Sequence, residues 1–372
     1  MKNILLYLLL GGSVFLVFDS CRPKKEDEPT VNTFDRTKML THLADQAIMP
    51  AYKDYQSKLA TLDQKVTDFE TKGDVAALTQ LRSAWLAAAK AYQASIFFDF
   101  GPAVDYVYAE QSNTFPVDTA LILSNIQSGS YNLASISNFD GKGLQAIDYL
   151  LYRPDLSDAE IVAKLSQTSE LKYLKDCVAD LEDVVGAVYS SWSNSYRASF
   201  IASATSNSEG SAVSNLLNAF SAVYEQRVRK GKVGLPAGVF NGYSQTPMPG
   251  HVEALYSGAS ITLLETNLEA MLNYFQGVSL DGATDGLGLS DYIDHVEAKK
   301  GSQLLSDAIR DQIESAKSAT TGISGALSEA VVQNKTAVSA LYNEMQELVS
   351  LIKVDLTAAL GVQITYQDTD GD

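Results

Sequence analysis

Residues 140–152 carry side chains whose types and spacing could do chemistry. Glycines precede a predicted helix in which Gln145 and Asp148 lie three positions apart, so both side chains project from one helix face. Leu144 and Leu151 fall on the face that packs inward. A carboxylate and an amide oxygen are hard donors, suited to a calcium-like ion or to hydrogen bonding. This segment is therefore the first candidate for a ligand or metal site.

Histidine is scarce in the sequence, which limits transition-metal and acid–base chemistry. Its three positions are His42, His251 and His295, and none belongs to an H-E-x-x-H pattern. His42 lies one turn from Asp45, and Glu297 closely follows His295, but isolated pairs of this kind favour surface histidines. Patterns for a nucleophilic serine, a phosphate-binding loop, a dinucleotide fingerprint or a cysteine cluster are absent from the sequence. We therefore predict no catalytic residues.

The chain ends in alternating aspartates, Asp368, Asp370 and Asp372. Alternating oxygens could chelate calcium, but a full calcium loop needs more ligands, including a distal bidentate carboxylate. We expect a frayed acidic tail instead.

Helical periodicity dominates the chain that must position these residues. Apolar residues recur three or four positions apart over 78–92, 171–192 and 341–352, which places one apolar stripe on each predicted helix. Comparable strand-like alternation is absent from the sequence. Amphipathic helices bury their stripes by packing together, so the pattern predicts an all-α protein built of helical bundles. The turn residues that separate the helices lie at 101–102, 138–143, 205–210, 231–250 and 277–288.

The domain organisation follows from the turn-rich stretch near residue 205. It divides the chain into 35–205 and 206–372, two similar halves that we predict to be four-helix, up-and-down-like bundles packed side by side. The glycine- and proline-rich run at 231–250 is too long for an ordinary interhelical turn, and loops of this length in compact domains are often functional.

The first residues resemble a bacterial lipoprotein signal. Lys2 precedes an apolar stretch, and Ser20 stands immediately before Cys21, so residues 1–20 are predicted to be cleaved and Cys21 to be lipidated. The alternative is a conventional signal peptide with Cys21 as a bystander. Residues 21–34 are charged and contain proline, which is typical of a flexible tether. We therefore expect lipid anchoring at the outer membrane, on its periplasmic face or on the cell surface.

Composition and net charge limit the classes of molecule that this protein is expected to bind. The part after residue 20 is long enough for two domains, and the formal net charge of −17 disfavours nucleic acid and anionic membrane surfaces while favouring cations or basic partners. The cysteines are Cys21 and Cys177. If Cys21 carries lipid, an intrachain disulfide cannot form, so Cys177 is predicted to be a small core residue.

The segment at 140–152 resembles the G-x-H-x-x-E motif of imelysin-like proteins, which are bacterial periplasmic or surface lipoproteins linked to iron uptake and also classed as metallopeptidases. Other stretches that are similar to this family lie at 85–102, 115–118, 253–257 and 361–372. They follow the family order over nearly the whole mature chain. The resemblance implies two all-α bundle domains with the motif helix near their interface.

The sequence departs from the family pattern at the motif itself. Gln145 stands at the histidine position, Asp148 at the glutamate position and Ala254 at a serine position. An amide replaces a good zinc or iron ligand, and the shorter aspartate sets its carboxylate back, so both changes weaken a transition-metal site. The resemblance leaves iron, zinc or calcium as possible cofactors, with Gln145 and Asp148 as the metal positions.

We expect Gly143, Glu253 and Ser257 to line an interdomain pocket. The leading hypothesis is a non-enzymatic, envelope-anchored binding component of iron or related nutrient acquisition that holds a small ligand or a metal ion in this cleft. The first alternative is a metal-dependent peptidase, which needs further ligands near Asp148, such as Glu253 or His251. The second is a cell-surface scaffold that binds another envelope protein.

Overall fold

The structure is a computed structural model that describes residues 33–367. The predicted signal peptide, Cys21, nearly all of the tether and the final aspartates lie outside the described residues. The described residues from Asp35 onward form one compact unit. The division into domains at residue 205 stays a prediction.

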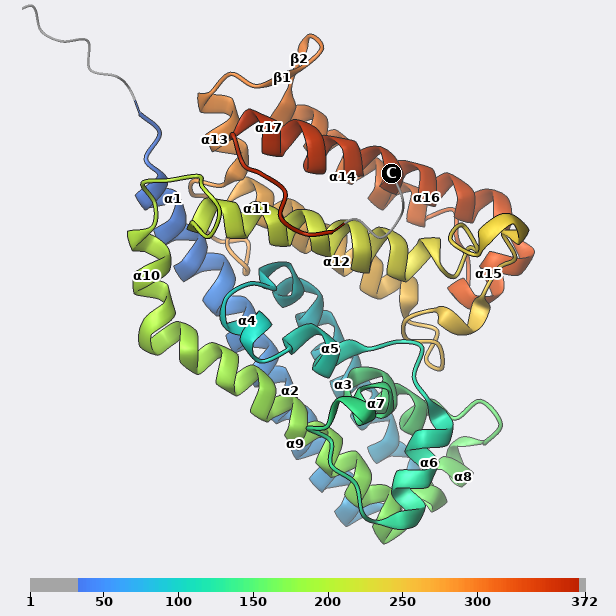
Figure 1. The fold of residues 1–372 in the computed structure, drawn as a ribbon. Coiled ribbons are helices and arrows are strands. Elements are labelled where there is room, and N and C mark those ends of the chain that lie inside the picture. The colour runs from blue at the N-terminus through green and yellow to red at the C-terminus, as the bar shows by residue number, and fades with distance from the viewer. Residues whose placement is uncertain (1–32, 368–372) are drawn as a thin grey trace, which may run out of the picture. The chain divides into compact units, whose positions relative to one another are not determined.

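The all-helical prediction is confirmed (Figure 1). The helices before residue 205 are α1 (Arg36–His42), α2 (Met49–Lys72), α3 (Val75–Ser95), α4 (Pro102–Asp105), α5 (Tyr108–Asn113), α6 (Thr119–Ser128), α7 (Gly143–Tyr152), α8 (Asp158–Leu165), α9 (Thr168–Ser191) and α10 (Arg197–Ala202). The later helices are α11 (Ala212–Ala222), α12 (Ser260–Gln276), α13 (Leu289–His295), α14 (Leu305–Thr320), α15 (Leu327–Gln333), α16 (Lys335–Ser350) and α17 (Thr357–Ala359).

Shorter or wider turns connect and extend these helices. The π-helical segments are η1 (Leu43–Ile48), η4 (Trp192–Tyr196), η5 (Val223–Gly234) and η8 (Leu351–Leu356). The 3-10 segments are η2 (Ile96–Phe98), η3 (Ile136–Gly141), η6 (Gly242–Ser244) and η7 (Pro249–His251). Two short antiparallel strands, β1 (Lys299–Lys300) and β2 (Gln303–Leu304), pair with Lys299 opposite Leu304.

The apolar stripes form the core as predicted. Helix α3 covers the first stripe, α9 the second, and α16 with η8 the third. Helix α2 packs along α3 and α9, where Leu78, Trp85 and Leu174 are fully buried (Figure 1). Cys177 is also fully buried, and burial raises the pKa of its thiol. It is therefore a core residue, as the sequence predicts.

Helix α12 connects the earlier and later parts of the chain. It packs on α3 on one side and on α14 on the other, and α14 in turn packs along α16 (Figure 1). Leu264, Leu268 and Met271 of α12 are almost fully buried. The α3–α12 contact brings together residues that lie far apart in the sequence, and the candidate site is built beside it.

The predicted break at 231–250 begins too early. Gly231 lies inside η5, and irregular structure starts only at Leu235. The helix continues because it buries Val228, Lys232 and Val233, and this packing outweighs the weak helix preference of glycine. The consequence is that Lys232 is held on a helix instead of a loop.

The last described residues, 361–367, lie along α11 and η5. The Asn218 side chain donates to the Gln363 carbonyl at 3.0 Å and accepts from the Thr365 N–H at 2.7 Å. The Tyr366 hydroxyl donates to the buried Glu225 carboxylate at 2.6 Å. These bonds tie the end of the chain to the η5 helix.

Within residues 33–367, no helix is both long enough and apolar enough to cross a membrane.

Candidate functional site

Helix α7 begins at a position that requires glycine. Gly143 has φ of +73°, and a Cβ atom there would lie 2.5 Å from the Ser112 carbonyl oxygen of α5. A side chain at this position would therefore push α5 and α7 apart. The close approach brings Asn113, the last residue of α5, against the polar face of α7. Gly143 thus shapes the site through backbone packing.

Both motif side chains of α7 are buried against residues 253–257. Gln145 Oε1 accepts a hydrogen bond from the Ala254 N–H at 2.7 Å. Asp148 is fully buried, and its two oxygens accept from the Tyr256 N–H at 2.9 Å and the Ser257 N–H at 3.1 Å. Ala254 has φ of +51°, a strained value for a residue with a side chain. The polar face of α7 therefore holds a strained backbone segment in place.

Burial raises the pKa of Asp148 from its ordinary value to about 7. The hydrogen bonds from Ser257 and Tyr256 lower the pKa, and the nearby Glu253 carboxylate raises it further. Desolvation is the largest of these effects, because the carboxyl group has no access to water. Asp148 therefore titrates close to neutral pH.

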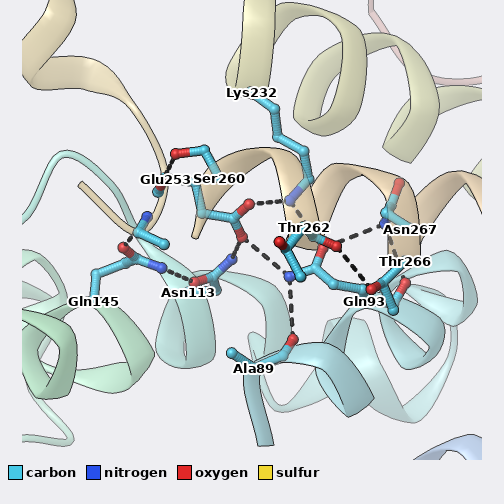
Figure 2. Close-up of polar contacts among 11 residues, drawn as sticks. Ala89, Gln93, Asn113, Gln145, Lys232, Glu253, Ser260, Thr262, Thr266 and Asn267 are labelled. Atoms are coloured by element: carbon cyan, nitrogen blue, oxygen red, sulfur yellow. Dashed lines mark hydrogen bonds and ion pairs between the residues drawn. The ribbon is translucent and has the colours of Figure 1, made fainter. Parts of the chain in front are cut away.

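Glu253 lies at the centre of a buried polar network (Figure 2). Its Oε1 accepts from the Asn113 amide at 2.7 Å and from the Gln93 amide at 3.1 Å. Its Oε2 forms an ion pair with Lys232, which also donates to Gln93 Oε1 at 2.8 Å. The carboxylate is thus surrounded by donors from α3, α5 and η5.

The network continues on both sides of Glu253 (Figure 2). Gln145 Nε2 donates to Asn113 Oδ1 at 2.7 Å, which links the α7 motif to Glu253. Asn267 of α12 donates to the Gln93 carbonyl at 3.1 Å. Lys232 is almost fully buried, and desolvation lowers its pKa, while the Glu253 charge opposes that shift. The motif helix and the Lys232–Glu253 pair therefore belong to one continuous hydrogen-bond network.

The donor set does not fit a metal ion in this arrangement. A bound zinc, iron or calcium ion needs several oxygen or nitrogen lone pairs directed at one point. Here the oxygens of Gln145, Asp148 and Glu253 face N–H donors, and the cation beside Glu253 is the Lys232 ammonium. Among the residues the structure describes, no cluster of three or more His, Cys, Asp or Glu side chains could hold a metal. The metal role of Gln145 and Asp148 stays a prediction that this geometry does not favour.

The structure brings Glu253 and Ser257 to the motif helix but places His42 elsewhere. Ser257 and Glu253 lie in the segment that α7 contacts, and the Ser257 hydroxyl donates to the Ala254 carbonyl at 3.3 Å. His42 contacts the Gly277 carbonyl at 2.6 Å, far along the chain from the motif, and Asp45 pairs with Arg197 at 2.5 Å. His42, which the sequence places at the surface, is half-buried against Gly277, and Asp45 forms an ion pair with Arg197.

A cavity of about 340 Å³ adjoins the network. Lys232, Gln93, Asn113 and Asn267 contribute to its wall and are buried, whereas Arg227 is 35% exposed in its side chain. Further lining residues are Tyr92, Ile96, Glu110, Phe115, Leu235 and His251. Polar groups at a mostly apolar wall are typical of a small-molecule site.

Gln93, Asn113, Lys232 and Asn267 were not predicted from the sequence. Gln93 and Asn267 are polar residues on the buried sides of otherwise apolar helices, and such positions need a partner. This signal marks a polar contact but does not identify the partner. Lys232 was hidden because its segment was interpreted as a loop.

The fold and this network define an all-helical protein whose motif helix, α7, contacts a buried acidic segment near α12. The chain belongs to the imelysin family: the family model, which is labelled as a peptidase family, matches residues 48–354.

Two solved structures share the fold. One is described as an iron-regulated protein A precursor from Parabacteroides distasonis; it has 18% identity and a TM-score of 0.72, and the match covers 87% of this chain and 94% of that one. The other is an imelysin-like protein from Psychrobacter arcticum, with 17% identity, a TM-score of 0.68, and coverage of 89% and 97%. Among proteins of curated function, no match was found.

Proposed function

We propose that this chain is a non-enzymatic binding protein that takes a small ligand into the cavity beside Lys232, without a metal ion. The Lys232–Glu253 pair carries this proposal. The ammonium supplies the positive charge beside Glu253 Oε2, and Gln93 and Asn113 donate to Oε1 of the same carboxylate. A carboxylate held by three donors in this way is suited to forming a rigid part of a binding-site wall, and the buried Asn267 Oδ1, which lacks a hydrogen-bond partner among the described residues, is left beside the cavity for a ligand donor.

The biological setting is part of the proposal. The fold is shared with a protein described as iron-regulated, and this supports a role in iron or related nutrient acquisition. The sequence before residue 21 supports export and lipidation at Cys21, which would anchor the protein at the cell envelope. Incorporation of labelled fatty acid into the wild-type chain, and its loss in Cys21→Ala, would test the anchor.

Metal analysis of the purified protein separates binding from metal-dependent proteolysis. We expect substoichiometric zinc and iron, and the same trace amount in Asp148→Ala. Stoichiometric metal that is lost in Asp148→Ala would overturn the metal-free proposal and favour the peptidase alternative, because a catalytic metal needs protein ligands from this network.

Ligand binding is tested by a thermal-shift screen of small metabolites, carried out before and after treatment with a chelator. We expect at least one compound to stabilise the protein equally in both conditions. Leu235→Trp fills the cavity from a half-buried position and should abolish the shift. Val332→Trp, at an exposed position of α15, is the matched control and should preserve it. A screen without any hit would count against the binding function.

A further inference from the structure

The cavity changes in character from its exposed end to its buried end. Glu110 and Arg227 have side chains that are 47% and 35% exposed, so they form the mouth. The buried wall has two parts. Tyr92 and Ile96 give it apolar surface, and beside them lie polar residues that bond mostly to one another, namely Gln93, Asn113, Lys232 and Asn267. A ligand that fits this cavity therefore has a polar, charged end and an apolar body.

The mouth holds one cation, Arg227, beside two carboxylates, Glu110 and Asp99, and hydrogen-bonding atoms of Arg227 and Glu110 are left for a ligand. Arg227 Nη2 donates to Glu110 Oε1 at 2.5 Å, and Asp99 lies 3.6 Å from the same nitrogen. Among the described residues, Arg227 Nε and Nη1 and Glu110 Oε2 have no hydrogen-bond partner. The guanidinium can therefore bind a carboxylate while the Glu110 carboxylate binds an ammonium group.

The charges around the cavity disfavour a multiply charged anion. The inner cation, Lys232, is neutralised by Glu253, and the mouth cation, Arg227, faces the carboxylates of Glu110 and Asp99. A multiply charged anion such as phosphate would meet these carboxylates and the strongly negative chain. A simple cation would leave the Arg227 donors unused. A ligand that carries one charge of each sign matches both groups.

We propose that the cavity binds a small zwitterion, an α-amino acid with an apolar side chain or a dipeptide. Its carboxylate lies against Arg227, its ammonium group against Glu110, and its side chain against Tyr92 and Ile96. The volume of about 340 Å³ is at the small end of the range of ligand pockets, about 300–1,000 Å³, which suits a ligand of this size. This inference rests on the proposed binding function and specifies its ligand.

Three probes with the same aromatic body test the charge requirement by calorimetry on the purified protein. L-Phenylalanine carries both charges, phenethylamine lacks the carboxylate, and 3-phenylpropionate lacks the ammonium group. We expect L-phenylalanine to bind, and each singly charged probe to bind about tenfold to a hundredfold more weakly, because each loses a charge-assisted hydrogen bond. Equal affinity for either singly charged probe, or displacement by inorganic phosphate, would overturn the assignment.

Arginine variants test the position of the site. Arg227→Met should weaken L-phenylalanine binding about tenfold or more, whereas phenethylamine should bind at least as tightly as to the wild type, because the variant frees Glu110 from its ion pair. Arg310→Met is the matched control, because Arg310 is similarly exposed and pairs with Asp307 and Asp311 on α14, outside the cavity. Equal effects of the two variants, or no effect of Arg227→Met, would contradict the proposed contact.

Different binding results would contradict the zwitterion assignment and the proposed binding function. If another class of compound binds the wild type and is lost in Leu235→Trp, the cavity is a binding site and only the zwitterion assignment is wrong. If no small molecule binds, the binding function itself is wrong. If L-phenylalanine binds equally to Leu235→Trp, its site lies elsewhere and the zwitterion assignment to this cavity is overturned.

Discussion

Lys232 and Glu253 depend on one another because both are buried. Removing one partner of a buried ion pair leaves the other charge without compensation, which costs about 3–5 kcal/mol. Replacing Lys232 and replacing Glu253 should cost different amounts of stability. Burial lowers the pKa of Lys232, so its amine can become neutral when its partner is removed. The energetics of the pair can be separated by a double-mutant cycle.

We predict that Lys232→Met lowers the free energy of unfolding by about 3–5 kcal/mol. Glu253→Gln should cost less, because Lys232 can release its proton when its partner is neutral. The double variant Lys232→Met/Glu253→Gln should recover much of the loss, because it leaves no buried charge at the pair. Denaturant unfolding measures all three values. A loss below about 1 kcal/mol in Lys232→Met would contradict a buried charge pair.

Asp148 should make the free energy of unfolding depend on pH, and the direction of this dependence follows from its pKa. Its folded-state pKa of about 7 lies above the unfolded value of about 4, so protonated Asp148 favours the folded state. This contribution is complete below about pH 4 and is lost as the pH rises through about 7, at up to about 1.4 kcal/mol per pH unit.

The measurement compares wild type with Asp148→Asn in denaturant series from pH 4 to pH 8. The stability of the wild type relative to the variant should fall across this range and become constant above it. A relative stability that rises with pH would show that the hydrogen bonds from Tyr256 and Ser257 outweigh desolvation.

At the scale of elements, the junction of α5 and α7 depends on Gly143. Gly143→Ala should destabilise the protein by at least about 3 kcal/mol, because a left-handed backbone and an overpacked contact with Ser112 both add cost. Gly129→Ala is the matched control: Gly129 has φ of +63°, but a Cβ there meets no atom within 4 Å. Its cost should be about 1–2 kcal/mol. Equal losses in thermal unfolding would show that the α5 contact is unimportant.

Local pattern predicts the elements better than it predicts the site. The apolar stripes of α3, α9 and α16 can be recognised in the sequence because helical periodicity depends only on residues three or four positions apart. The α7 face was visible for the same reason, and the family resemblance added Glu253. Lys232 and Asn113 were missed because their partner is far away in the sequence, with 140 positions between Asn113 and Glu253.

The start of the irregular segment was wrong for a related reason. Glycine and proline counts favoured a loop from residue 231, but tertiary burial of Lys232 and Val233 keeps η5 helical through Gly234. Single-sequence propensity cannot include that burial, because the surrounding helices are not known from local sequence.

At the scale of the whole molecule, the buried network and the α3–α12 contact couple the two predicted halves. Hydrogen bonds join Gln93, Asn113 and Gln145 to Glu253, Ala254 and Asn267, so unfolding of either half would remove the partners of polar groups in the other.

We predict one cooperative unfolding transition in calorimetry, with equal calorimetric and van't Hoff enthalpies. Lys232→Met should shift the whole transition to lower temperature. Two resolved transitions, with only one shifted by Lys232→Met, would show instead that residues 35–205 and 206–372 unfold as separate domains.

The Lys232–Glu253 pair also has a consequence for maturation. A metalloprotein of this size is complete only after an ion has been delivered, so its active fraction depends on metal supply during export. Here the counter-charge of Glu253 is part of the polypeptide and arrives when η5 folds against α3. Under the metal-free binding function proposed above, folding alone completes the wall of the cavity, and the fraction of correctly folded protein should be the same in metal-replete and metal-starved cells.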